Sequence, residues 1–224
     1  MLVLYLVRHG QTECSRESRF CGSGSDVPLV PEGVEMAEAL GSYYAETPWE
    51  AIYASPLLRA RQTAEPLARR CGQTVHVEPG LREIAYGAWE GMVEAEVRRH
   101  APEAFGAWMK DPGRNAPPGG ERGIDIAERA LPVVDSIRAR HPSGNVLAVS
   151  HKATIRVLVC ALLGLDVGLY RARIGQSVAA VTVFEFREGG PLLRAMGDTS
   201  HLPDRLRLGL EGMSTPPRRA RRDE

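Results

Sequence analysis

The chain alternates short apolar runs with longer segments in which apolar residues recur at helical spacing. A short apolar run rich in branched residues predicts a strand buried on both faces of a sheet. Apolar residues spaced by three or four positions predict a helix with one buried side. The predicted strands cover residues 2–7, 51–54, 74–77 and 145–149, and the predicted helices cover 32–44, 58–67, 93–109, 124–140 and 153–163, with a break at Pro102.

The last part of the pattern predicts a pair of strands, 178–186 and 192–196, joined by a turn. Alternating strands and helices form a mostly parallel sheet with helices on both faces. We therefore predict an α/β fold, a three-layer α/β/α sandwich, as a single domain over residues 1–210. Prolines and arginines in residues 211–224 predict a disordered basic tail. The terminal strands could also pair across a homodimer.

Histidines stand directly behind two of the predicted strands. Arg8 and His9 follow the first strand, and His151 follows the strand at 145–149. The carboxyl ends of parallel strands lie at one edge of a sheet, where open α/β sheets bind their ligands. We therefore expect these three side chains to lie close together.

Two further ionisable residues can reach the same edge. Ser55 follows the second strand, and we expect it to cap the next helix, which carries Arg59 near its amino end. Glu83 lies in a loop at 81–91 that is dense in ionisable and aromatic residues. The long loop at 11–31 is another candidate, since loops of this length in compact domains are usually functional.

Two imidazoles, two guanidiniums and one carboxylate predict a site for phosphoryl transfer. Arg8 and Arg59 would hold a dianionic phosphate by forked hydrogen bonds. One neutral histidine would attack phosphorus, and the other would donate to the oxygens on which charge accumulates. Glu83 would protonate the leaving alkoxide and then deprotonate the attacking water. Since the protein supplies the cations, we expect no metal and no cofactor.

The charge balance narrows the range of partners. Lys and Arg number 28 and Asp and Glu number 28, so no overall field favours nucleic acid or a membrane surface. No apolar stretch approaches the roughly 20 residues of a membrane span, and no secretory segment precedes the first strand. We therefore expect a cytoplasmic protein whose partner is a small phosphorylated metabolite, bound by clustered cations.

The four cysteines show no spacing typical of a metal site. Cys160 lies in an apolar run and is interpreted as a small buried hydrophobe. Cys14 and Cys21 lie in the long loop after the first strand, where a reactive thiol is one alternative.

Four blocks of sequence resemble the histidine phosphatase superfamily, whose members include the cofactor-dependent phosphoglycerate mutases. The blocks are LVRHGQTE at 6–13, SPLLRARQTA at 55–64, LREIAYGAWEG at 81–91 and VSHKATIR at 149–156. The resemblance covers about residues 2–202 and implies a phosphoglycerate mutase-like fold. It implies that His9 is the nucleophile, that Arg8, Arg59 and His151 form the phosphate pocket, and that Glu83 is the acid.

The chain departs from the family pattern at several positions. Ser15 stands where many members place an asparagine against the phosphate, and a serine can still donate a hydrogen bond. Lys152 and Ala153 replace the Gly-Gly pair that commonly follows the second histidine. Lys152 would therefore add a cation or bulk at the rim of the pocket. Gln11 occupies a position that is often acidic.

The segment between Glu83 and His151 favours a phosphatase over a mutase. A mutase must exclude water and hold a second phosphorylated ligand, usually with extra basic residues on an inserted lid. This segment is short, and Arg98 and Arg99 within it are interpreted as a solvated helix face. We therefore predict a phosphomonoesterase. A cofactor-dependent mutase is the first alternative, and a non-catalytic phosphate-binding module is the second.

Aromatic residues on the two loops are candidates for contact with the substrate. Tyr86 is expected to face the leaving group, and core packing is the alternative for Tyr86 and Trp89. Arg19, Phe20 and Cys21 on the long loop are further candidates.

Overall fold

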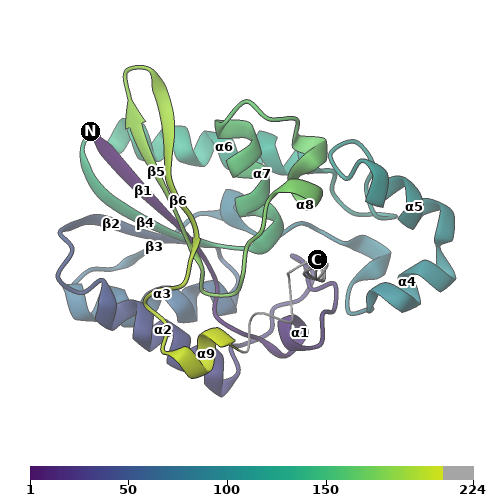
Figure 1. Cartoon of the computed structure of the whole chain (residues 1–224), viewed down its shortest axis with the longest axis horizontal. Coiled ribbons are helices and arrows are strands. Elements are labelled where there is room, and N and C mark those ends of the chain that lie inside the picture. The colour runs from purple at the N-terminus through teal and green to yellow at the C-terminus, as the bar shows by residue number, and fades with distance from the viewer. Residues whose placement is uncertain (209–224) are drawn as a thin grey trace, which may run out of the picture.

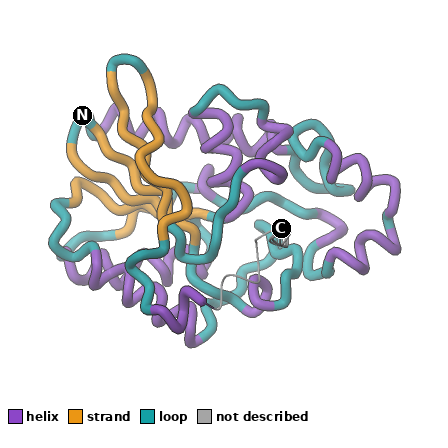
Figure 2. The backbone as a smooth tube through the Cα atoms, viewed as in Figure 1, coloured by secondary structure: helices purple, strands orange, loops and turns teal. Residues whose placement is uncertain are grey.

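A six-stranded sheet in the order β3-β2-β4-β1-β5-β6 forms the centre of the computed structural model, which describes residues 1–208 (Figures 1 and 2). The strands are β1 (Leu2–Arg8), β2 (Trp49–Ala54), β3 (Val75–Val77), β4 (Gly144–Ser150), β5 (Val181–Arg187) and β6 (Gly190–Asp198). β1 to β4 run parallel, and β5 is antiparallel to β1 and to β6. The prediction of a mostly parallel sheet is confirmed.

Helices cover both faces of the sheet (Figure 1). They are α1 (Glu13–Arg16), α2 (Pro31–Tyr43), α3 (Leu58–Cys71), α4 (Glu94–His100), α5 (Pro102–Lys110), α6 (Gly123–Arg140), α7 (Lys152–Leu162), α8 (Tyr170–Arg173) and α9 (Asp204–Leu208), with short 3-10 helices at Pro79–Leu81, Gly87–Trp89 and Val167–Leu169. α6 and α7 lie on one face, and α2 and α3 lie on the other. The three-layer arrangement is therefore confirmed.

The central strand β4 shows why its sequence is an unbroken apolar run. Val146 and Ala148 belong to the core beneath α6 and α7. Leu147 and Val149 belong to the core on the opposite face, beneath α3. Alternate residues of a strand point to opposite faces, so a strand covered on both sides must be apolar throughout.

α4 and α5 project beside the sheet and have a small core of their own (Figure 1). The predicted break at Pro102 is confirmed, because Pro102 begins α5 directly after α4. Trp89, Phe105 and Trp108 pack together there with Phe20 from the long loop. Core packing is thus the structural role of Trp89.

One predicted helix cap is wrong. We expected Ser55 to cap α3, but α3 begins at Leu58 and Leu57 is its N-cap, without a side-chain hydrogen bond. The end of β2 lies beside β4, and the Ser55 N–H donates to the Val149 carbonyl oxygen (2.9 Å). This pairing holds Ser55 at the sheet edge, where its hydroxyl lies 2.7 Å from Nε2 of His151.

The predicted terminal strand pair is confirmed as β5 and β6, and β6 is an edge strand. Its pairing across a homodimer stays a prediction, as does the single domain. Of the helices that the structure describes, none is long and apolar enough to cross a membrane. The predicted tail at 211–224 lies outside the described residues.

Candidate active site

Two histidines lie side by side at the carboxyl edge of the sheet. β1 and β4 are parallel neighbours paired along their whole length, so the residues that follow them leave the sheet together. The His9 N–H donates to the Ser150 carbonyl oxygen (3.0 Å), and the rings of His9 and His151 have centroids 5.2 Å apart. Both side chains are buried. The two strand ends converge as the sequence predicts.

The His9 ring is held in one tautomer and kept neutral. Its Nδ1 lies 2.7 Å from the Gly10 carbonyl oxygen, which can only accept, so Nδ1 carries the proton and Nε2 keeps its lone pair. Burial, with the nearby Arg59 and Arg8, holds the pKa of His9 well below its ordinary value of 6.5. Gly10 is needed for close packing against the amino end of α2, because a Cβ atom there would lie 2.6 Å from the Gly33 carbonyl oxygen.

His151 has one ring nitrogen paired and one unpaired. Burial, followed by the charge of Arg59, holds the pKa of His151 well below 6.5. The Ser55 hydroxyl contacts its Nε2 and accepts the Leu57 N–H (3.3 Å), which favours donation of the hydroxyl proton to Nε2. Nδ1 then carries the ring proton, and it is buried without a partner among the described residues. Leaving such a buried donor unpaired is costly.

Two guanidiniums are fixed beside the histidines. Arg8 ends β1, and its Nη1 donates to the Gln176 carbonyl oxygen (2.8 Å). Arg59 lies in the first turn of α3 and donates to carbonyl oxygens of the long loop, including that of Ser25 (2.7 Å). Burial lowers the pKa of Arg8 to about 10 and also lowers the pKa of Arg59, yet both remain cations at neutral pH. Their geometry suits a dianion.

The Glu83 carboxylate lies at the amino end of α7. It accepts the N–H groups of Ala153 (3.2 Å), Thr154 (3.3 Å) and Ile84 (3.0 Å). The first N–H groups of a helix have no partner within the helix and attract negative charge. Glu83 is buried and lines the same cavity as His9.

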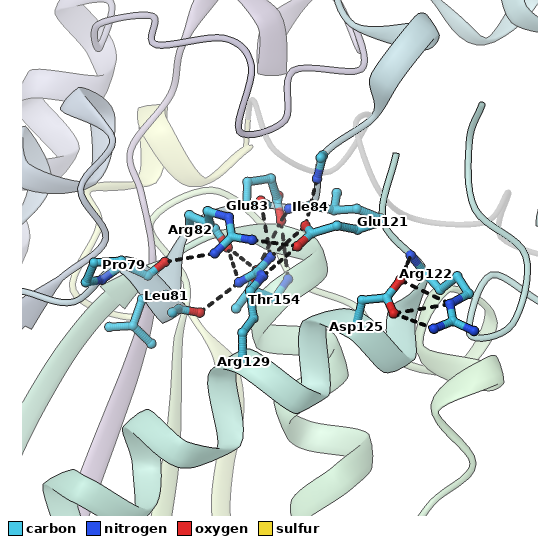
Figure 3. Close-up of polar contacts among 12 residues, drawn as sticks. Pro79, Leu81, Arg82, Glu83, Ile84, Glu121, Arg122, Asp125, Arg129 and Thr154 are labelled. Atoms are coloured by element: carbon cyan, nitrogen blue, oxygen red, sulfur yellow. Dashed lines mark hydrogen bonds and ion pairs between the residues drawn. The ribbon is translucent and has the colours of Figure 1, made fainter. Parts of the chain in front are cut away.

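A partly buried ion pair fixes the chain segment that carries Glu83 (Figure 3). Arg129 of α6 pairs with Glu121 (2.9 Å) and donates to the carbonyl oxygens of Arg82 (2.9 Å) and Glu83 (3.2 Å). Glu121 in turn accepts the Ala85 N–H (2.9 Å). Burial alone would raise the pKa of Glu121, but the hydrogen bond from Arg129 lowers it. Sequence reasoning missed this pair, which holds Glu83 from outside the cavity.

A cavity of about 290 Å³ opens in front of these residues. The predicted site residues that line it are Arg8, His9, Ser15, Arg59, Glu83, Tyr86 and Lys152, and the three loop candidates Arg19, Phe20 and Cys21 line it too. His151 is fully buried beside His9 and is not among the lining residues.

Ser15 and Tyr86 have structural roles as well as a place on the cavity wall. The Ser15 hydroxyl donates to the Thr12 carbonyl oxygen (2.9 Å) and accepts the Thr12 N–H (2.9 Å), which caps α1. Its contact with a phosphate stays a prediction. Tyr86 packs edge-on against Phe20, with ring centroids 4.9 Å apart, so it serves the small core and the cavity together.

Lys152 is the first residue of α7 and lines the cavity. Burial, followed by the charges of Arg8, Arg156 and Arg171, lowers the pKa of Lys152 to about 6. At the rim of the cavity, where the sequence predicts a cation or bulk, Lys152 is therefore an amine whose charge titrates.

The lining residues that sequence reasoning missed include Arg156, Tyr170 and Arg171. Arg156 follows Lys152 by one helical turn, a spacing that could have found it. Tyr170 and Arg171 come from the short helix α8, which leaves no helical pattern in the sequence. Arg98 and Arg99 are exposed, as predicted. The extra basic residues of the site come instead from α7 and α8, which follow the segment between Glu83 and His151.

The reactive-thiol alternative for Cys14 and Cys21 is wrong. The two residues form a disulfide with Cα atoms 6.1 Å apart, and both line the cavity. The turn of α1 brings them together, and the sequence spacing did not indicate it. Cys160 is a free buried thiol, as predicted. Among the described residues, His, Cys, Asp and Glu side chains form no group of three that could hold a metal ion.

Comparisons with known proteins agree with this geometry. Residues 4–199 match the model of the histidine phosphatase superfamily (branch 1). Phosphoserine phosphatase 1 of Hydrogenobacter thermophilus is 31% identical over 202 residues, which are 90% of this chain and 95% of that protein. A glucosyl-3-phosphoglycerate phosphatase of Mycolicibacterium vanbaalenii is 39% identical over 171 residues, 73% of this chain and 75% of that one.

A solved structure gives the same result for the fold. Bacillus stearothermophilus YhfR is similar with a TM-score of 0.84 and 34% sequence identity, over 90% of this chain and 99% of that chain. The sequence match covers nearly all of the chain and includes both histidines, both arginines and the glutamate of the cavity. The protein therefore belongs to the histidine phosphatase superfamily and is a phosphatase.

Proposed function

We propose that this phosphatase hydrolyses a small phosphorylated metabolite through a phosphohistidine formed on His9, without a metal ion. The observation that carries the proposal is the His9 ring, which is buried, neutral and hydrogen-bonded through Nδ1 beside two guanidiniums. A neutral Nε2 facing a bound phosphoryl group is a competent nucleophile. Arg8 and Arg59 supply the positive charge that stabilises the phosphoryl oxygens.

In the first step, Nε2 of His9 attacks phosphorus as the bond to the ester oxygen breaks. The phosphomonoester enters as its monoanion, and Glu83 passes that proton to the leaving oxygen, so the product alcohol departs neutral. In the second step, water attacks the phosphohistidine, Glu83 takes a proton from it, and the N–P bond breaks. Inorganic phosphate leaves, and His9 and Glu83 return to their starting states.

His151 would act on the phosphoryl group through Nδ1. Its Nε2 is occupied by Ser55, and the buried Nδ1 has no partner among the described residues. A phosphoryl oxygen at that nitrogen would satisfy the buried donor and gain a hydrogen bond where charge develops. Ser55 would therefore select the tautomer that His151 needs.

The test is turnover by the wild type, His9→Ala and Glu83→Gln on phosphoserine, 3-phosphoglycerate, sugar phosphates, nucleotides and nitrophenyl phosphate. We expect selective phosphate release by the wild type, unaffected by EDTA, and none by His9→Ala. Glu83→Gln should lower kcat/KM about 100-fold or more for alkoxide leaving groups, but far less for nitrophenyl phosphate, whose leaving group needs little protonation. Activity of His9→Ala, or a requirement for metal, would contradict the proposal.

A phosphoglycerate mutase is the second candidate, and one observation favours it. A mutase must bind a second anionic group, and Lys152, Arg156 and Arg171 line the cavity in addition to the two arginines of the phosphate pocket. The same assay decides between the two reactions. Conversion of 3-phosphoglycerate to 2-phosphoglycerate in the presence of the bisphosphate cofactor, with little phosphate released, would establish the mutase.

A further inference from the structure

We propose that the cavity contains a second anion subsite, formed by Arg156 with Lys152 and Arg171, and that the preferred substrate carries a second acidic group, a carboxylate or another phosphate. The inference rests on the proposed function, because it concerns the part of the substrate that remains after the phosphoryl group is transferred. It specifies the substrate class that this site selects.

The charge on the cavity wall exceeds what one phosphoryl group requires. The lining side chains include six basic residues, Arg8, Arg19, Arg59, Lys152, Arg156 and Arg171, and two acidic residues, Glu83 and Glu94. Arg8 and Arg59 match the two charges of a phosphomonoester. Arg19 is paired with Glu17 on the loop. The cations that remain come from α7 and α8.

Arg156 is the clearest member of this group. Its side chain is only 7% exposed, and its buried Nε has no hydrogen-bond partner among the described residues. Within the described residues 1–208, no carboxylate lies within ion-pair distance of Arg156, whereas the partly buried Arg129 of α6 is paired with Glu121. Burying an unpaired charge is strongly unfavourable. An anionic ligand would remove this penalty.

A second buried donor faces the same cavity. Tyr170 is 2% exposed, and its hydroxyl has no partner among the described residues. An anion with several oxygens can accept from the phenol and from a guanidinium together. The wall at α7 and α8 is therefore rich in donors and poor in acceptors.

The flanking cations are held in place by other contacts. The Arg171 guanidinium lies over the Trp108 ring, 4.4 Å from its centroid, and its Nη2 lies 3.5 Å from Glu94. Lys152 precedes Arg156 by one turn of α7, so both lie on one side of the helix. The lowered pKa of Lys152 reflects burial and the charges of Arg8, Arg156 and Arg171, and a bound anion would relieve that repulsion.

The size of the cavity limits what can carry the second charge. A volume of about 290 Å³ lies at the lower end of the range for small-molecule sites. The ligand is therefore a short molecule with its two acidic groups close together, such as a phosphorylated carboxylic acid or a small bisphosphate.

The test compares substrates that differ only in the second group. The carboxylate arm uses 3-phosphoglycerate and glycerol 3-phosphate, the phosphate arm uses fructose 1,6-bisphosphate and fructose 6-phosphate, and nitrophenyl phosphate has no second anion. We expect the wild type to prefer the acidic member of at least one pair. Arg156→Gln should reduce that preference about 10- to 100-fold, as expected for one charge-assisted hydrogen bond, and change nitrophenyl phosphate turnover less than about threefold.

Three variants make the result specific. Arg156→Lys keeps the charge and should restore part of the preference. Lys152→Met changes a less buried position. It allows the preference for the acidic substrate to be tested even if Arg156→Gln does not fold. Arg173→Gln removes an exposed arginine from α8 and should change nothing. Equal preference of the wild type for both members of both pairs, or an equal loss on every substrate in Arg156→Gln, would overturn the subsite.

Binding to His9→Ala separates this inference from the proposed function. The same pairs are titrated into that variant by calorimetry, which needs no turnover. Tighter binding of the acidic member supports the subsite even if His9 proves not to be the nucleophile. Equal binding of both members overturns the subsite even if the phosphohistidine is found.

Discussion

At His9, burial and charge act on the imidazole in the same direction. Removal from water disfavours the imidazolium, and Arg59 and Arg8 repel it, so the pKa of His9 is held well below 6.5. The Gly10 carbonyl oxygen, which only accepts, then places the remaining proton on Nδ1. One residue is thus prepared as a nucleophile by its surroundings, before any substrate binds.

We expect the His9 ring to stay neutral through pH 6 in the ligand-free protein. Protonation would place a cation beside two buried guanidiniums, so its midpoint must fall below the ordinary histidine value. An NMR titration of labelled histidine, with the exposed His76 as an internal reference, measures this midpoint and the tautomer. A His9 midpoint at or above 6.5, or a proton on Nε2 in the neutral ring, would contradict the account.

Ser55 acts through His151 and not as a helix cap. We expect Ser55→Ala to lower kcat about tenfold with little change in KM, because the loss of one buried hydrogen bond costs about 1 to 1.5 kcal/mol. Ser42→Ala, at an exposed position of α2, is the matched control. Steady-state kinetics on the best substrate measure both. A change confined to the thermal midpoint, with kcat intact, would mean that Ser55 is only structural.

At the scale of the elements, two helices fix the Glu83 carboxylate from opposite sides. The amino end of α7 supplies N–H donors to the carboxylate, and α6 supplies Arg129 to the carbonyl oxygens of the same segment. The backbone of a loop needs such partners when it is buried. The position of the acid therefore depends on helices far from it in the sequence.

We expect Arg129→Gln to lower kcat/KM for alkoxide substrates about tenfold or more, with a smaller effect on kcat/KM for nitrophenyl phosphate. The variant removes one of the two arginines that pair with the partly buried Glu121, so it should also lower the free energy of unfolding by about 1 to 2 kcal/mol. Glu128→Gln, on the exposed side of α6, should be neutral within about 0.5 kcal/mol. Equal loss on both kinds of substrate would show that Arg129 stabilises the fold without positioning the acid.

The disulfide between Cys14 and Cys21 restrains the loop that forms one wall of the cavity. It closes a short loop of sequence separation 7, for which the chain-entropy model gives about 2 kcal/mol. We expect the Cys14→Ser/Cys21→Ser variant to lose about that much stability and to have a raised KM. Treatment of the wild type with dithiothreitol should have the same effect, and Cys71→Ser, a free cysteine, should not. An unfolding curve that dithiothreitol leaves unchanged would contradict this role.

The elements and the strand-end residues were predictable because each leaves a local signal. β4 was found as an apolar run, and His9 and His151 were found because they stand behind strands. Ser55 was misread because a serine before Pro56 has the local signature of a cap, and only the pairing of β2 with β4 reveals its other role. Arg171 and the disulfide could not be predicted, because they depend on how α8 and α1 fold back toward the cavity.

At the scale of the whole molecule, a chain with no net charge concentrates positive charge in one cavity. Lys and Arg balance Asp and Glu at 28 each, but the cavity wall holds six basic residues and only two acidic ones. Low-dielectric walls strengthen such a local field, which draws in small anions without attracting polyanions to the rest of the surface. The fold therefore favours the binding of a small anion in the cavity at one edge of its sheet.

The most direct test of the account is to trap the phosphoryl group on the enzyme. Glu83→Gln is mixed with nitrophenyl phosphate, denatured at alkaline pH, where phosphohistidine survives, and digested for mass spectrometry. The phosphoryl group should accumulate on His9. The nitrophenol leaving group needs no acid, so the phosphohistidine forms, but the attacking water lacks its base, so the phosphohistidine is hydrolysed slowly. Phosphorylation of another residue, or nitrophenol release with no phosphoryl group on His9 at any time, would contradict it.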